Sequence, residues 1–219
     1  MAPDRKDSSN SSKHEMPHAT SGTTRIEAIS DGIFAVAMTL LILGIKVPEH
    51  ASATALPGAL FGLWPQILAF AVSFLISTFF WIAHTLLFES IERSDRTLLW
   101  INAAFLMFLV LVPLSTQLIA TYGHTRTSVI VYGVNIILVG VMLQLTWAYA
   151  SRGRRLISDD SSQSYIKLTA TRLFALPLMG AVSICVAYLN TTVSLVIYVV
   201  GPILFSLPSR FTPYHRRVS

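Results

Sequence analysis

The sequence predicts an all-α membrane protein with six transmembrane helices and both termini in the cytoplasm. Hydrophobic residues make up 53% of its 219 residues and charged residues only 12%, which is about half the charged share of a typical soluble domain. The mean hydropathy is correspondingly high, at +0.61. The charged residues lie in short islands between long uncharged runs. These observations exclude a soluble globular fold and indicate that lipid surrounds most of the chain.

The two ends of the chain are predicted to lie outside the membrane. The first 24 residues are rich in Ser, Thr, His and charged side chains and have almost no bulky apolar ones, so burial cannot offset the entropy lost on ordering. We expect residues 1–24 to form a disordered cytoplasmic tail. Residues 25–208 then form the six-helix transmembrane domain, and residues 209–219 form a basic cytoplasmic tail.

Six segments approach the roughly 20 apolar residues that a helix needs to cross the hydrocarbon layer. A short polar turn separates the third segment from the fourth, whereas the fifth and sixth are divided only around Asn190 and Thr191. That last pair is therefore predicted to be a helical hairpin, mainly because of its total length. The six predicted spans are residues 26–46, 57–84, 97–121, 128–149, 171–189 and 191–208.

The distribution of Lys and Arg predicts the orientation of these spans, because cytoplasmic loops carry the excess of positive residues. If the N-terminus is cytoplasmic, 14 of the 16 Lys and Arg residues lie on the inner side. Only Lys46 and Arg126 lie outside. This asymmetry favours an even number of spans, with both termini inside.

The first span is unusual because its apolar core is short. Residues 32–45 would extend only about 21 Å, and a helix must begin near Ile26 to reach about 30 Å. The longer helix brings Glu27, Ser30 and Asp31 into or against the membrane, where an unpaired carboxylate costs several kcal/mol. We therefore expect Asp31 to have partners on other helices. The alternative is that Asp31 lies in the inner headgroup region.

Residues 25–43 resemble the first-helix signature of the transmembrane-protein-175 family of potassium channels. The signature consists of Arg, three residues and then Phe-Ser-Asp, which Arg25, Ser30 and Asp31 match and Ile29 replaces at the Phe position. The resemblance covers about residues 25–116. Residues similar to the family's second and third helices follow in matching order, namely Trp81, His84, Asp95, Asn102, Leu106 and Pro113.

The resemblance implies a six-helix subunit whose first helix lines a central pore for potassium ions. It implies a homotetramer, because the chain holds a single repeat, and a place in the plasma membrane of a bacterium as a multi-pass protein. It also implies that Arg25, Ser30 and Asp31 are tied to His84 on the second helix and Asn102 on the third. These five residues would anchor the pore helix and would not bind the ion.

The family's pore constriction consists of bulky aliphatic residues on the first helix, and the matching positions are Val36, Leu40 and Leu43. At 100° per residue these positions fall on one narrow stripe, and Asp31 points about 140° away from it. Such a stripe blocks ions by dewetting when the pore is narrow. The alternative is that all three are ordinary helix-packing residues.

The sequence says less about the basis of ion selectivity than about the constriction. The chain has no Thr-Val-Gly-Tyr-Gly loop, so a carbonyl filter of the usual potassium-channel kind is not expected. Thr39 lies at the edge of the apolar stripe and could supply a layer of hydroxyl groups. Its alternative role is a hydrogen bond to a carbonyl of its own helix.

Other classes of function have weaker support. A proton-coupled secondary transporter that uses Asp31 and His84 as a relay is the main alternative, and a scaffold without transport is a third. No enzyme motif, cofactor motif or metal-ligand cluster is present, since His84 and the single cysteine, Cys185, both lack partners at ligand spacing. Nucleic acid is not an expected partner, because the basic residues flank hydrophobic spans and meet lipid headgroups.

Overall fold

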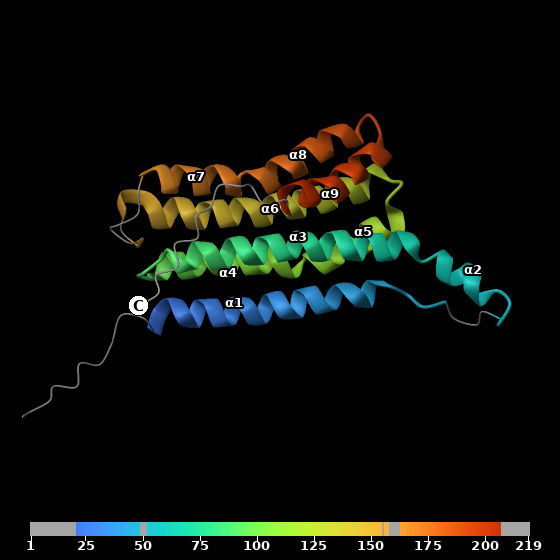
Figure 1. Cartoon of the computed structure of the whole chain (residues 1–219), viewed down its shortest axis with the longest axis horizontal. Coiled ribbons are helices and arrows are strands. Elements are labelled where there is room, and N and C mark those ends of the chain that lie inside the picture. Colours follow the sequence, from blue (N-terminus) through green and yellow to red (C-terminus); the bar gives the residue numbers. More distant parts are fainter. Residues whose placement is uncertain (1–20, 49–51, 155, 158–162, 207–219) are drawn as a thin grey trace, which may run out of the picture.

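The computed structural model describes residues 21–48, 52–154, 156–157 and 163–206. Across these ranges the chain is a bundle of long, roughly parallel and antiparallel α-helices (Figure 1). Extended structure within them is limited to an isolated bridge between Ile91 and Ile157. The helices are α1 (Ser21–Leu40), α2 (Leu56–Phe61), α3 (Trp64–Glu89), α4 (Arg96–Val110), α5 (Val112–Tyr122), α6 (Arg126–Ser151), α7 (Gln163–Leu173), α8 (Ala175–Ala187) and α9 (Thr191–Ser206).

Within the described residues, five helical stretches are long and apolar enough to cross a membrane, which confirms the predicted all-α membrane class. They correspond to the first five predicted spans. The sixth predicted span is only partly matched, because the described apolar helix there, Thr191–Val200, is shorter. The six-helix count and the cytoplasmic termini remain predictions, and the predicted tails lie mostly outside the described residues. The five stretches are Gly22–Gly44, Leu56–Glu89, Arg96–Tyr122, Arg126–Ser151 and Ile166–Ala187.

Helix α1 begins at Ser21, four residues before the boundary predicted for the N-terminal tail. Composition placed residues 21–24 in the tail because they are small and polar. In the structure Thr23 is buried, and Gly22 lies so close to the Ser94 side chain that a Cβ at Gly22 would be 2.5 Å from Ser94 Oγ. Tertiary contact therefore extends the helix beyond what composition predicts.

The helices are arranged in three groups (Figure 1). Helix α1 lies along one side of the bundle and packs against α3, α4 and α5. Helices α6 to α9 lie on the opposite side of α3 to α5. Short α2 projects beyond the end of the bundle. This arrangement leaves α1 at the edge of the chain, with one long face free of contact with the other groups.

Helices α4 and α5 form one span that is interrupted at Leu111. Pro113, in the first turn of α5, has no backbone N–H and cannot continue the hydrogen-bond ladder of α4. Beside this interruption Asn135 Nδ2 on α6 donates to the Phe108 carbonyl at 2.9 Å, and the same carbonyl accepts from the Leu111 N–H at 3.2 Å. A polar side chain of α6 is thus bonded to the backbone where the α4–α5 span is interrupted.

Helices α6 and α8 approach closely because glycines face bulky side chains. Gly140 on α6 lies directly beneath the Pro177 ring of α8, and a Cβ at that position would be 2.7 Å from Pro177 Cδ. Gly133, two turns away on the same face, lies against Ile184. Small residues of this kind allow helix backbones to pack tightly in lipid, where hydrophobic association between helices is weak.

Candidate functional site

Helix α1 has two distinct faces. Ser30, Phe34 and Ala37 are at most 2% exposed and contact the bundle, together with Ile26 and Leu41. Their spacing of three or four residues places them on one side of the helix. The opposite side has no partner within the described ranges, so one face of α1 meets the bundle and the other does not. Large apolar residues on the exposed side are Ile29 (60% exposed), Val36 (56%), Leu40 (39%) and Leu43 (70%).

A buried polar cluster joins α1 to α3 and α4. Asn102 Nδ2 on α4 donates to Ser30 Oγ on α1 at 3.2 Å, and Asn102 Oδ1 lies 3.0 Å from His84 Nε2 on α3. Ser30 Oγ in turn donates to the Ile26 carbonyl at 2.8 Å. The Asn102 oxygen can only accept, so this pairing assigns the proton to His84 Nε2. We call Ser30, His84 and Asn102 the polar anchor.

Aromatic rings enclose the His84 side chain. Its ring stacks on Phe88 and Phe105, with centroid distances of 4.4 and 5.3 Å, and meets the edge of Phe34 at 5.9 Å. Phe34 lies on the buried face of α1, so the rings extend the contact between α1 and the rest of the bundle. The imidazole is thus fixed by one hydrogen bond and by stacking on both faces, which is the environment of a packing residue.

Asp31 has a different partner from the one that the family resemblance implied. Trp81 Nε1 on α3 donates to Asp31 Oδ1 at 2.8 Å, whereas His84 bonds to Asn102. Arg25 lies exposed on α1, and no hydrogen bond or ion pair joins it to the anchor among the residues that the structure describes. The structure therefore brings together three of the five predicted anchor residues and adds the Asp31–Trp81 pair beside them. A direct Asp31–His84 proton relay is not formed.

The sequence contained a signal for the role of Trp81. Trp81 and His84 are three residues apart on one helix, so they lie on the same face, and that face meets α1. Asp31 follows Ser30 directly and therefore reaches a neighbouring part of α3. The pattern predicts contact with α3 but does not distinguish which α3 side chain each α1 residue meets.

Replacing Trp81 with Phe is expected to destabilise the protein by about 1 kcal/mol, because the carboxylate of Asp31 loses its donor while partly solvated. Thermal unfolding in lipid nanodiscs measures the effect. Trp100 is the matched control, since it is 78% exposed on neighbouring α4. If Trp81→Phe and Trp100→Phe unfold at the same temperature, the Asp31–Trp81 bond contributes no stability.

Thr39 lies on the exposed side of α1, and its hydroxyl points back along the helix. Thr39 Oγ1 is 2.9 Å from the carbonyl oxygens of both Ala35 and Val36. The single hydroxyl proton is used by this local bonding, whereas the oxygen keeps lone pairs that can accept. A cation near this face would therefore meet an acceptor.

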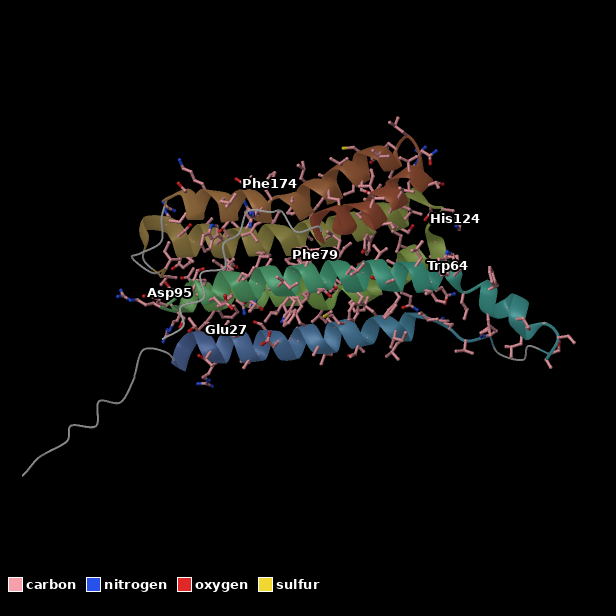
Figure 2. The ribbon with its side chains drawn as sticks, in the orientation of Figure 1. Glu27, Trp64, Phe79, Asp95, His124 and Phe174 are labelled. Atoms are coloured by element: carbon pink, nitrogen blue, oxygen red, sulfur yellow. The ribbon has the colours of Figure 1, made fainter. Side chains whose placement is uncertain are left out.

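The α3–α4 connection is fixed at the end of the bundle that carries Glu27 and Asp95 (Figure 2). Asp95 Oδ1 accepts from the Leu98 backbone N–H at 2.8 Å and so caps α4. The Tyr149 hydroxyl on α6 donates to Asp95 Oδ2 at 2.6 Å. The start of α4, which carries Asn102, is thus held against α6. No group of three or more His, Cys, Asp or Glu side chains that could bind a metal occurs among the described residues.

Comparison with known proteins matches the same segment. Residues 25–113 match the family described as endosomal/lysosomal potassium channel TMEM175. A potassium channel of Chamaesiphon minutus is 31% identical over 194 residues, which cover 86% of this chain and 96% of that protein. A potassium channel of Streptomyces collinus is 34% identical over 160 residues, with 71% and 77% coverage.

A solved structure shares the fold. The crystal structure of a lysosomal potassium-selective channel TMEM175 homolog from Chamaesiphon minutus has a TM-score of 0.76 and 30% identity, and the match covers 86% of this chain and 98% of that chain. The family is one of multi-span membrane channels and not of enzymes, and its bacterial members are consistent with a place in the plasma membrane. The two Chamaesiphon minutus matches extend over nearly the full length of those chains, and the family match includes the segment that holds the polar anchor. The chain therefore belongs to the TMEM175 family.

Proposed function

We propose that this protein is a potassium-permeable channel that conducts passively through a tetrameric pore lined by α1. The observation that carries the proposal is the exposed apolar face of α1, which has no partner among the residues that the structure describes. Relatives named potassium channels support the choice of ion. Six transmembrane helices per subunit, cytoplasmic termini and a homotetramer in the plasma membrane belong to the same proposal.

The constriction consists of Val36, Leu40 and Leu43. All three are exposed on one side of α1 or its short 3-10 extension, Leu41–Gly44. Four copies of this face around an axis would form successive rings of aliphatic side chains. Such rings exclude water and ions when narrow, and they conduct when the side chains move apart.

The polar anchor sets which face of α1 points to the axis. Ser30 lies on the buried side of the helix and is bonded to Asn102. Rotation of α1 about its own axis would break that bond inside the bundle, where no water replaces it. The Trp81 bond to Asp31 restrains the same helix at a second point. The anchor residues therefore position the pore helix and do not bind the ion.

Replacing Val36 with Asn is expected to raise potassium flux several-fold, because an amide ring wets the constriction. Potassium efflux from liposomes that contain the purified protein measures the change. The control is Val134→Asn. Val134 is also exposed, but it lies on α6, on the opposite side of helices α3 to α5 from α1 (Figure 1). Equal flux through wild type and Val36→Asn would exclude Val36 from the conduction path.

Replacing Thr39 with Ala is expected to reduce the preference for potassium over sodium, because a layer of hydroxyl acceptors is lost. The reversal potential under opposed potassium and sodium gradients, recorded in planar bilayers, reports this preference. Ala is compatible with the helix, so pore structure is preserved. An unchanged reversal potential would leave Thr39 with only its local bonds to Ala35 and Val36.

A further inference from the structure

A cavity of about 370 Å³ lies among α3, α5, α6 and α9, on the side of α3 away from α1. It is near the end of the bundle where Trp64 and His124 are labelled (Figure 2). Its volume is in the range of pockets that bind small molecules. The walls are mainly apolar and include Pro65, Leu68, Ala69, Val72, Leu195 and Val199.

Three buried residues with hydroxyl groups, Ser73, Tyr132 and Tyr198, interrupt the apolar lining. Ser73 and Tyr132 line the cavity and are each 1% exposed, and Ser73 Oγ lies 2.9 Å from the Tyr132 hydroxyl. Thr116 Oγ1 donates both to Ser73 Oγ and to the Val112 carbonyl, each at 2.8 Å. The single Thr116 proton is shared between its two acceptors, and the Ser73–Tyr132 contact uses one of that pair's two protons, so one hydroxyl proton and several oxygen lone pairs remain. The row of hydroxyls therefore has capacity for a further donor.

The lining also defines the charge of a suitable ligand. The lining residues include no Asp, Glu, Lys or Arg. A charged group placed there would lose hydration without an opposite charge. A neutral molecule with a long apolar part and one hydrogen-bond donor fits both the walls and the hydroxyl row.

The described chain does not fill this cavity. One side of the cavity is formed by Gly123 and His124, which lie in the connection between α5 and α6. This side is therefore at the end of the bundle. Helix α9 begins beside that end and continues toward the middle of the bundle (Figure 1).

We propose that this cavity binds small neutral amphiphiles that consist of an apolar chain and one hydroxyl group. The chain lies against Ala69 and Leu195, and the hydroxyl donates to the oxygen of Ser73 or Tyr132. The cavity is separate from the exposed face of α1, so the proposal does not depend on the identity of the pore.

A photoreactive alcohol tests the site directly. The full-length protein in phosphatidylcholine nanodiscs is illuminated with a diazirine-bearing hexanol, and mass spectrometry locates the adducts. We expect adducts on the α3, α6 and α9 residues that line the cavity. Ala69→Phe fills the cavity and should remove them, whereas Ala71→Phe on the exposed side of the same helix should retain them. Equal labelling of the two variants, or adducts scattered over lipid-facing residues, overturns the proposal.

A second comparison isolates the hydroxyl. Ser73→Ala, and separately a diazirine-bearing hexane without the hydroxyl, should each reduce labelling by roughly threefold to tenfold, which corresponds to the loss of one hydrogen bond. If Ala69→Phe fails to fold, Val199→Phe fills the cavity from α9 instead. A hexane probe that labels as strongly as the alcohol would show a space filled by lipid chains only, and would refute a hydroxyl site.

Discussion

Replacing Asn102 with Leu is expected to destabilise the protein by about 2–4 kcal/mol, because a buried His84 N–H and the Ser30 oxygen lose their partner. Ser30 keeps its own donation to the Ile26 carbonyl, so most of the cost falls on His84. Because Asn102 bonds α1 to α4, and α1 is proposed to line the pore, loss of stability should accompany altered potassium flux. Thermal or denaturant unfolding in a defined detergent and liposome flux measure the two effects.

The double variant His84→Phe/Asn102→Leu provides the control for this prediction. Removing both partners leaves no buried N–H unpaired, and a Phe ring can stack between Phe88 and Phe105 as the imidazole does. The double variant should therefore be more stable than Asn102→Leu alone, a coupling that a double-mutant cycle quantifies. If the double variant is less stable than the single one, the anchor bond is not the source of the effect.

Replacing Gly140 with Val is expected to cost about 3 kcal/mol, because the new side chain overlaps the rigid Pro177 ring of α8. The ring cannot rotate away, so α8 must shift from α6. The loss should appear as a lower unfolding temperature and as faster proteolysis of the α7–α9 region. The α1 half of the bundle is expected to be affected less, because it packs on α3 to α5.

Two variants distinguish this packing effect from a general intolerance of substitution. Gly58→Val places its side chain where no other atom lies within 4 Å of the added Cβ, so its effect should stay within about 0.5 kcal/mol. Pro177→Ala, introduced into Gly140→Val, removes the ring and should restore part of the lost stability. Failure of this second change to restore any stability would mean that the Gly140–Pro177 contact is not limiting.

The sequence predicted the parts of this fold that lipid imposes. Long uncharged runs located five spans, because a helix in hydrocarbon must satisfy its backbone internally and present apolar side chains. The helical period also separated Val36 and Leu40 from Asp31 on α1. The structure then shows those two residues exposed and Asp31 bonded to α3.

The pairing of polar residues was less predictable. Ser30, His84 and Asn102 were grouped through a family resemblance, whereas Asp31 meets Trp81 because of the exact rotation and depth of α3. Helical periodicity predicts which face of a helix a residue lies on. It does not predict which residue of a neighbouring helix lies at the same depth. Likewise, composition misplaced the start of α1, because the order of residues 21–24 depends on the α3–α4 connection.

The distance along the chain between Ser30 and Asn102 has a consequence for biosynthesis. The two partners are 72 residues apart, so a ribosome that adds about 5–20 residues per second makes α1 roughly 4–14 s before its hydrogen-bonding partner. During that interval the nascent helix carries an acidic side chain at the insertion machinery, and its Ser30 oxygen, whose proton bonds to the Ile26 carbonyl, has not yet met the Asn102 donor. Stable entry of the first segment into the bilayer is therefore expected to wait for the emergence of the third, and a ribosome stalled before Asn102 should leave α1 accessible to water-soluble reagents.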